Sequence, residues 1–257
     1  MTRRIAALLL LLAPLAVHSG APARAADTRP VTARPAAARR APAKPAARAA
    51  EPRLVLSWKA PFGTPGAASA IEAGCGDTTV VDTLYLSFDP GKDAPDFRGA
   101  SANLYFHAQE GATLGDYWKQ GGGGVNGAPL RVIFESDEDR GFMTPWNSQG
   151  AGAPFYDFVG GSGRLRIIYA IAGGSPVRAG KLYGLARVLV RRAAEGTSGC
   201  GAPMCVEWHS AMFAYSVGEE RGVNKGDRWV SLNSPGGKVC ESSRGVAGVK
   251  TWRPGQK

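Results

Sequence analysis

Histidine is the side chain best suited to acid-base chemistry near neutral pH, and this chain has three. His18 lies in an apolar N-terminal run, so His107 and His209 remain as catalytic candidates. Both sit in alternating, strand-like sequence, which favours hydrogen-bonded or surface histidines over a general base. No Gly-x-Ser-x-Gly, His-Glu-x-x-His or phosphate-binding glycine motif accompanies them. The sequence therefore predicts a protein that is not an enzyme.

Glu135, Asp137, Glu138 and Asp139 form the one dense acidic cluster of the sequence. Carboxylates two residues apart can converge on a hard cation, so Glu135, Asp137 and Asp139 are candidate calcium ligands. The cluster could also supply the paired carboxylates of a glycoside hydrolase. It lacks the glycine and terminal glutamate spacing of an EF-hand loop, which favours a solvated acidic turn. We expect no cofactor, with calcium as the open alternative.

Aromatic residues in loop-like sequence are the stronger indication of a binding site. Tyr117 and Trp118 precede four glycines, Trp146 follows a proline, and Phe155 and Tyr156 lie in a Gly/Pro-rich stretch. Flat rings on loops can stack on sugars or fill a pocket on a protein partner. Tyr117, Trp118, Trp146 and Tyr156 are therefore candidate ligand-binding residues. The alternative is that these rings cap the ends of the fold.

The four cysteines are Cys75, Cys200, Cys205 and Cys240. An even number in an exported chain indicates disulfides, and four cysteines allow three pairings. Cys200 and Cys205 enclose a Gly/Pro turn, so spacing favours a local bridge between them and a second bridge from Cys75 to Cys240. A zinc site fits poorly, because the two-knuckle pattern needs two close pairs.

From Arg53 onward, short apolar alternations are separated by glycine-rich turns, and no long stretch keeps a helical period. Trp58 and Trp208 fall within these alternations and should lie in the core. The pattern predicts a single antiparallel β-sandwich of jelly-roll or immunoglobulin-like type with long Gly-rich loops, over residues 53–257. The expected strands are Leu54–Trp58, Thr79–Phe88, Ala100–His107, Leu130–Glu135, Arg164–Ala172, Leu182–Arg191, Cys205–Ser216 and Arg228–Leu232.

The N-terminal residues have the pattern of an export signal. Arg3 and Arg4 precede an apolar run that is too short to span a membrane permanently, and Ala23-Arg24-Ala25 supplies a small-x-small cleavage pattern. Residues 1–25 are therefore expected to be a signal peptide, with no transmembrane segment after cleavage. Residues 26–52 are rich in Ala, Pro and Arg and should form a disordered tether. The mature protein is expected to be secreted or to stay in the periplasm or cell envelope.

The formal net charge of +10 could indicate a nucleic-acid partner. Residues 1–52 hold nine Lys or Arg and two Asp or Glu, which leaves 22 basic and 19 acidic residues in the rest of the chain. A protein that tracks phosphates needs clustered charge on a folded face. No nucleic-acid partner is expected.

The succession of strands resembles that of cohesin domains and the related carbohydrate-binding modules. The resemblance is carried by GDTTVV (76–81), FRGASANLYF (97–106), GRLRIIY (163–169) and GKLYGLARVLV (180–190). Cohesins are extracellular β-sandwiches that bind dockerin modules, and their relatives bind polysaccharide. This chain departs from the cohesin pattern after the second of these segments, where His107-Ala108-Gln109 stands in place of aromatic-Asp-Pro. The resemblance implies the fold and the class of activity, and no individual binding residue.

The sequence is compatible with three functions. The first is an exported, non-catalytic adhesion module of cohesin type that engages an extracytoplasmic, dockerin-like protein. The second is a carbohydrate-binding module that uses the loop aromatics on a polysaccharide, and the third is a secreted hydrolase. Contacts through a flat sandwich face would favour the first, a row of exposed rings the second, and a cleft with facing carboxylates the third.

The expected signal peptide leads to a direct test. Mass spectrometry of protein purified from its native compartment should find a mature N-terminus at or next to Ala26, because export signals are cleaved after the small-x-small pattern. An intact Met1 on protein from the cytoplasm would contradict the export assignment.

Overall fold

The computed structural model describes residues 51–109, 112–119, 129–146, 150–215, 220–234 and 240. The expected signal peptide and nearly all of the expected tether lie outside the described residues, as do the four glycines at 121–124. Within the described ranges, no helix has the length and apolar character needed to cross a membrane.

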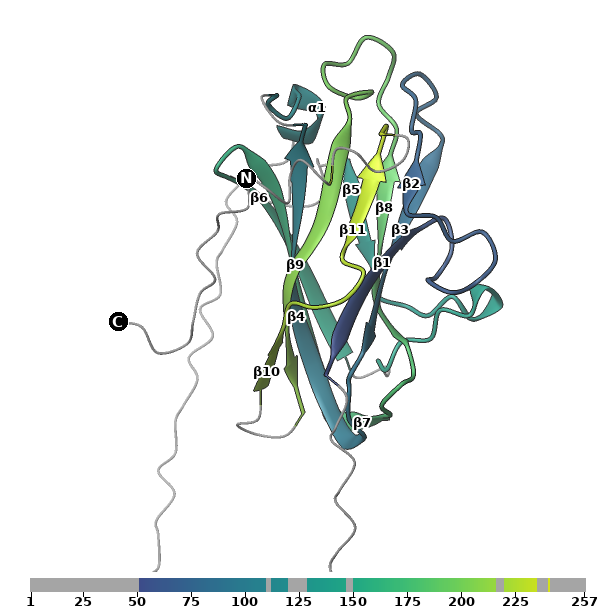
Figure 1. The fold of residues 1–257 in the computed structure, drawn as a ribbon, viewed down its shortest axis with the longest axis vertical. Coiled ribbons are helices and arrows are strands. Elements are labelled where there is room, and N and C mark those ends of the chain that lie inside the picture. Colours follow the sequence, from purple (N-terminus) through teal and green to yellow (C-terminus); the bar gives the residue numbers. More distant parts are fainter. Residues whose placement is uncertain are drawn as a thin grey trace, which may run out of the picture. The chain divides into compact units, whose positions relative to one another are not determined.

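The described part of the chain from residue 51 onward forms two β-sheets (Figure 1). The smaller sheet has the order β1 (Arg53–Trp58), β3 (Val81–Asp89), β8 (Tyr183–Arg191) and β5 (Leu130–Ile133). The larger has the order β2 (Ala70–Ile71), β11 (Trp229–Leu232), β9 (Met204–Ala214), β4 (Ala94–Ala108), β7 (Ser162–Val177) and β6 (Gly150–Val159), with β10 (Glu220–Val223) paired to β9. Neighbouring strands are antiparallel except β2 and β11. The predicted β-sandwich class is confirmed.

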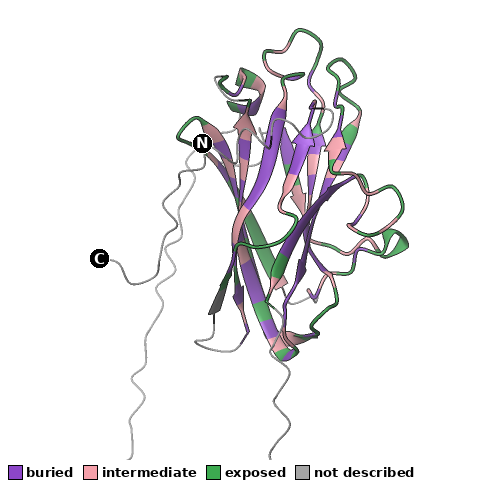
Figure 2. Cartoon of the chain, in the orientation of Figure 1, coloured by how far each residue is buried: buried purple, intermediate pink, exposed green. Residues whose placement is uncertain are grey.

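Alternation of side chains places the core between the sheets. In β7, Leu165 and Ile167 are fully buried, whereas Arg166 and Ile168 face outward and are exposed. Buried residues run along the strands of both sheets (Figure 2), and β1 is buried at every position after Arg53. Trp58 and Trp208 are fully buried, which confirms their predicted place in the core.

β6 is the main element that the sequence did not predict. Gly150, Gly152 and Pro154 give it the composition of a loop, yet it pairs with β7 over its whole length. The two glycines are required by close packing, because a Cβ at Gly150 or Gly152 would lie 2.5 or 2.4 Å from the ring of Tyr169. Pro154 is tolerated because β6 stands last in the strand order of its sheet.

The disulfide pairing expected from sequence is wrong. Cys75 is bonded to Cys200, and Cys205 to Cys240, with Cα–Cα distances of 5.8 and 5.0 Å. Cys205 is a strand residue, and alternation in β9 turns its side chain to the outer face of the larger sheet, away from the turn that holds Cys200. Spacing along the chain therefore did not determine which cysteines meet, because side-chain direction decides it.

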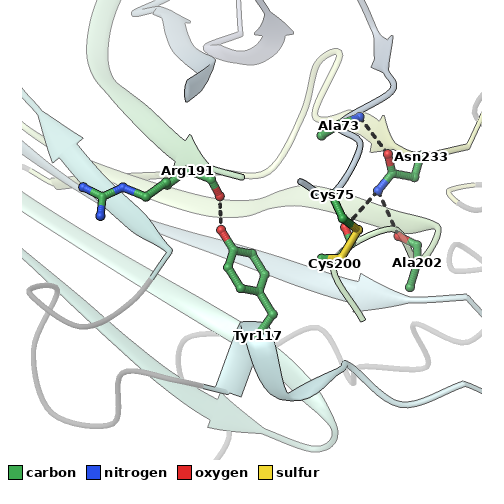
Figure 3. The surroundings of a disulfide bond; sticks show 7 residues. All are labelled: Ala73, Cys75, Tyr117, Arg191, Cys200, Ala202 and Asn233. Carbon is green, nitrogen blue, oxygen red and sulfur yellow. Dashed lines mark hydrogen bonds between the residues drawn. A yellow bond between two sulfur atoms is a disulfide. The ribbon is translucent and has the colours of Figure 1, made fainter. Parts of the chain in front are cut away.

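Asn233 joins the segments around the first disulfide (Figure 3). The backbone N–H of Ala73 donates to Asn233 Oδ1 over 2.7 Å, and Asn233 Nδ2 donates to the carbonyl oxygens of Cys200 and Ala202 over 3.3 and 3.5 Å. Asn233 has a φ of 55°, a left-handed conformation that asparagine tolerates better than most residues. The amide thus holds residue 73 beside the 200–202 turn, where Cys75 reaches Cys200.

Peptide mapping under non-reducing conditions tests this pairing. Trypsin alone leaves Cys200 and Cys205 in one peptide, but cyanogen bromide cleaves after Met204 and separates them. The double digest should release Cys75 linked to the Cys200 peptide and Cys240 linked to the Cys205 peptide. In the chain-entropy model, the separations of 125 and 35 residues correspond to stabilisation of about 5 and about 4 kcal/mol. A Cys200–Cys205 peptide without Cys75 would contradict the structure.

Candidate functional site

A row of polar and aromatic side chains crosses the outer face of the larger sheet. Register places five outward-facing residues directly opposite one another on β6, β7, β4, β9 and β11; they are Asp157, Arg164, Tyr105, Glu207 and Trp229. We call these five residues the outer row. The residues next to them in the strands, such as Leu104 and Trp208, point into the core and are fully buried. Strand pairing therefore assembles a row that no single stretch of sequence contains.

An ion pair forms the β6 end of the outer row. Arg164 Nε donates to Asp157 Oδ1 over 2.8 Å, and Arg164 Nη2 contacts the second carboxylate oxygen. Arg166, one outward position along β7, brings its Nη2 to 3.7 Å from Asp157 Oδ2. The hydrogen bonds from Arg164, helped by the charges of both arginines, hold the pKa of Asp157 below its usual range.

Glu207 places a buried carboxylate in the middle of the face, with its side chain 5% exposed. Its Oε2 lies 3.4 Å from His107 Nε2, and its Oε1 lies 3.4 Å from both His209 Nδ1 and Arg228 Nη1. Arg228 Nη1 also donates to the carbonyl oxygens of Trp208 and His209, over 3.1 and 2.8 Å. We call Glu207, His107, His209 and Arg228 the Glu207 cluster.

The surroundings of Glu207 stabilise its charged form. Burial on its own raises the pKa of a carboxyl group, because it penalises the anion. Here hydrogen bonds from His107 and His209, together with the charges of His209 and Arg228, outweigh burial and lower the pKa of Glu207 to about 2. The carboxylate is therefore ionised at any physiological pH and ties β4 and β9 to the segment that leads into β11.

Two aromatic rings are stacked on His107. The ring of Tyr105 is stacked on it at a centroid distance of 5.7 Å and 7° between planes, and the ring of Trp229 at 6.3 Å and 29°. His209 meets the edge of Tyr105 at 5.2 Å. Both histidines are hydrogen-bonded strand residues, as the sequence indicated.

Ser162, His107 and Glu207 lie in hydrogen-bonded series, the order of groups found in serine hydrolases. Ser162 Oγ is 2.9 Å from His107 Nδ1, and the other ring nitrogen faces Glu207. The carboxylate is shared with His209 and Arg228. The series links β7, β4 and β9 through these side chains.

Exposed apolar side chains lie beside the outer row on the same face. Phe155 is 48% exposed on β6, Ile168 is 50% exposed on β7, and Met212 is 39% exposed on β9. Ile168 and Met212 both pair with Ser101 of β4, so they lie on either side of this serine, and Phe155 pairs with Arg166, two residues before Ile168 on β7. We call Phe155, Ile168 and Met212 the apolar patch. Apolar side chains beside internally paired charges are typical of a binding surface.

The rings predicted to bind a ligand occupy other positions. Trp118, on the short helix α1 (Asp116–Lys119), is 2% exposed and stacks on Phe106 at 5.7 Å. The hydroxyl of Tyr117 donates to the carbonyl oxygen of Arg191, which ties α1 to the end of β8 (Figure 3). Burial raises the pKa of Tyr117 to about 12. Trp118 is therefore a core residue, which corrects the expectation of a loop ring.

Trp146 and Tyr156 also face inward. The Trp146 ring is stacked on Phe97 and on Tyr169, at centroid distances of 5.6 and 4.4 Å, and its Nε1 donates to the carbonyl oxygen of Leu185 over 2.8 Å. Tyr156 belongs to strand β6 and is 3% exposed, and burial raises its pKa. For these two rings, as for Trp118, the capping alternative describes their place better than an exposed platform does.

The acidic cluster is divided by its contacts. Arg187 Nη1 donates to Asp137 Oδ2 over 2.9 Å, and the hydroxyl of Tyr85 donates to the same oxygen over 3.2 Å. Glu135 lines a cavity of about 420 Å³ beside Trp146, and Asp139 lies exposed in the 3-10 helix η1 (Glu138–Arg140). Among the described residues, no three His, Cys, Asp or Glu side chains are placed to hold a metal ion together.

Sequence reasoning missed the outer row and the role of Glu207. Tyr105, Arg164 and Trp229 each occupy a polar or aromatic position within a predicted strand, which was the available signal. Their meeting depends on which strands are neighbours and in what register, and a single sequence does not contain that information.

The depressed pKa of Glu207 predicts a defined acid dependence of stability. A carboxyl with a folded-state pKa near 2 against its usual 4.5 stabilises the fold above about pH 4.5, and this stabilisation is lost as the pH falls toward 2. Glu207→Gln keeps the shape and removes the charge. We expect wild type to exceed this variant in unfolding free energy by about 3 kcal/mol at pH 7, a difference that should shrink toward zero near pH 2.

Urea unfolding at a series of pH values measures this difference. Glu72→Gln, at an exposed position, is the matched control and should follow wild type throughout. If the unfolding free energies of Glu207→Gln and wild type differed by the same amount from pH 7 to about pH 2, the fold would not stabilise the ionised carboxylate over the protonated one, and the prediction would be wrong.

No protein-family model and no curated protein matches the chain. Among solved structures, it is similar to the cohesin module from the family 33 glycoside hydrolase of Clostridium perfringens ATCC13124. The two share 12% sequence identity with a TM-score of 0.36, over 70% of this chain and 97% of the module. Because the sequence identity and the TM-score are this low, we infer the function of the chain from the geometry of the outer face.

Proposed function

We propose that this chain is an exported, non-catalytic adhesion module that binds an extracytoplasmic protein with the outer face of β6, β7, β4 and β9. The observation that carries the proposal is the apolar patch, three large side chains between 39 and 50% exposed on β6, β7 and β9 of one sheet face. Burying exposed apolar side chains against a partner removes them from water, and this contributes favourable free energy to binding.

Charge on this face supports a protein partner of mixed polarity. Asp157 is paired with Arg164, and Glu207 with Arg228, so these charges largely cancel one another and need no partner to compensate them. Arg166 pairs with Phe155 and lies two residues before Ile168 on β7, and its guanidinium is 48% exposed, so a partner's carboxylate or carbonyl groups can reach it. Protein interfaces are enriched in aromatic residues, methionine and arginine.

Export is supported by two disulfides within the fold and by the leader pattern. Disulfides persist in oxidising compartments outside the cytoplasm, where an adhesion module would meet its partner. The resemblance of the strand succession makes a dockerin-like module the first partner to test.

Photo-cross-linking in living cells tests the face even while the identity of the partner is unknown. A photoreactive phenylalanine analogue at position 155 should form a covalent adduct with one specific protein, because Phe155 lies on the proposed interface. The same analogue at Met143, which is 41% exposed elsewhere, is the matched control and should give no such adduct.

Adding Ile168→Asp should then reduce the yield of the adduct at least tenfold, because a charge in the centre of an apolar contact costs about 2 kcal/mol or more. Thermal unfolding checks that the variant remains folded. An adduct that forms equally from position 143, or that survives Ile168→Asp, would place the interface elsewhere.

A further inference from the structure

A cleft of about 710 Å³ lies where the two sheets meet, beside the Glu207 cluster. One wall is the loop that follows β1, with Phe62 and Thr64, and the other is the segment that leads into β11, with Asp227, Arg228 and Trp229. We call this the Trp229 cleft. Its volume is within the range of sites that enclose small ligands.

Backbone hydrogen bonds fix both walls. The N–H groups of Leu54 and Leu56 donate to the carbonyl oxygens of Lys225 and Asp227 over 2.7 and 2.9 Å, which holds the second wall against β1. Across the cleft, Trp58 and Ala68 exchange N–H to carbonyl bonds of 2.8 and 3.1 Å, which anchors the loop. A site whose walls are held in this way needs little ordering when a ligand binds.

Two half-buried rings enter the cleft from opposite walls. Trp229 rests on the imidazole of His107, which fixes the orientation of the indole, and also lines the cleft. Phe62 comes from the loop after β1 and lies in the same cavity. Together they provide apolar surface on which the C–H face of a ligand can pack.

The polar lining offers hydrogen-bond acceptors and therefore fits a ligand with many hydroxyl groups. Asp227 and Arg228 are the two charged residues among those lining the cleft, and the charge of Arg228 is compensated by Glu207. Thr64 Oγ1 donates to the carbonyl oxygen of Pro61 over 2.7 Å. Its hydrogen is used in that bond, so the hydroxyl oxygen can accept a hydrogen bond from a ligand, as can the exposed carboxylate of Asp227.

We propose that the Trp229 cleft is a binding site for a short neutral oligosaccharide. A sugar presents O–H donors to Thr64 and Asp227 at its rim and C–H groups to Phe62 and Trp229 at its faces. The exposed carboxylate of Asp227 disfavours an anionic ligand, because the charge of Arg228 is already compensated by Glu207. The site is separate from the apolar patch, and it uses none of the aromatic residues that the sequence indicated.

Isothermal titration calorimetry on the mature protein tests the site. The probes are short neutral oligosaccharides of glucose, xylose, mannose and N-acetylglucosamine, with an oligogalacturonate as the anionic comparison. At least one neutral probe should bind, and more tightly than the anionic one. Phe62→Ala and Asp227→Asn should each weaken that binding about tenfold or more, as truncation of central contacts does.

Phe158→Ala and Asp139→Asn, an exposed ring and an exposed carboxylate outside the cleft, are matched controls and should change the affinity by less than about twofold. Asp227 is exposed, so Asp227→Asn tests the site even if Phe62→Ala impairs folding. Failure of every neutral probe to bind, tighter binding of the anionic probe, or unchanged affinity in both cleft variants would overturn the proposal. The adduct at position 155 should be the same with and without Phe62→Ala, so the two proposals succeed or fail separately.

Discussion

The carboxylate of Glu207 is a charge removed from water at the centre of a sheet, and such a group is tolerated only when its surroundings replace its hydration. His107 on β4, His209 on β9 and Arg228 before β11 supply that replacement. Three segments are therefore fixed relative to one another by one side chain. Arg228 is anchored further by two carbonyl oxygens, so the start of β11 is held as well.

Both proposed surfaces depend on this arrangement. On one side, the fixed strands β4 and β9 carry the outer face, with Met212 and Ile168 of β7 on either side of Ser101. On the other, Arg228 and Trp229 form a wall of the cleft, and the indole is supported by His107. The protein thus uses internally compensated charge to build rigid surfaces, and it leaves apolar groups and neutral hydroxyls to meet its ligands. Rigid surfaces favour binding because less conformational entropy is lost on association.

The sequence was sufficient to predict the fold class and most strands because alternation is a local property. Leu165 and Ile167 against Arg164 and Arg166 define both faces of β7 whatever strands lie beside it. β6 was missed because Gly150, Gly152 and Pro154 resemble a loop, while the two glycines are in fact required by the ring of Tyr169 on the adjacent strand.

The same dependence on neighbouring strands explains why the ligand-binding rings and the disulfide pairing were predicted incorrectly. Trp118 stands in loop-like sequence but reaches Phe106 of β4, and Cys205 turns away from Cys200 because of its place in β9. Tyr105, Glu207 and Trp229 come together through register alone. The local sequence predicts which side chains of a strand face inward and which face outward. Contacts between segments that are distant in the sequence decide which rings are exposed and which charges meet.

The central claim is that the outer face of the larger sheet is where a protein partner binds. Methyl NMR of the mature protein, labelled at isoleucine and methionine and titrated with the partner, observes that face directly. The account predicts that the signals of Ile168 and Met212 shift or broaden while that of Met143 stays in place. Perturbation of Met143 with Ile168 and Met212 unchanged would contradict it.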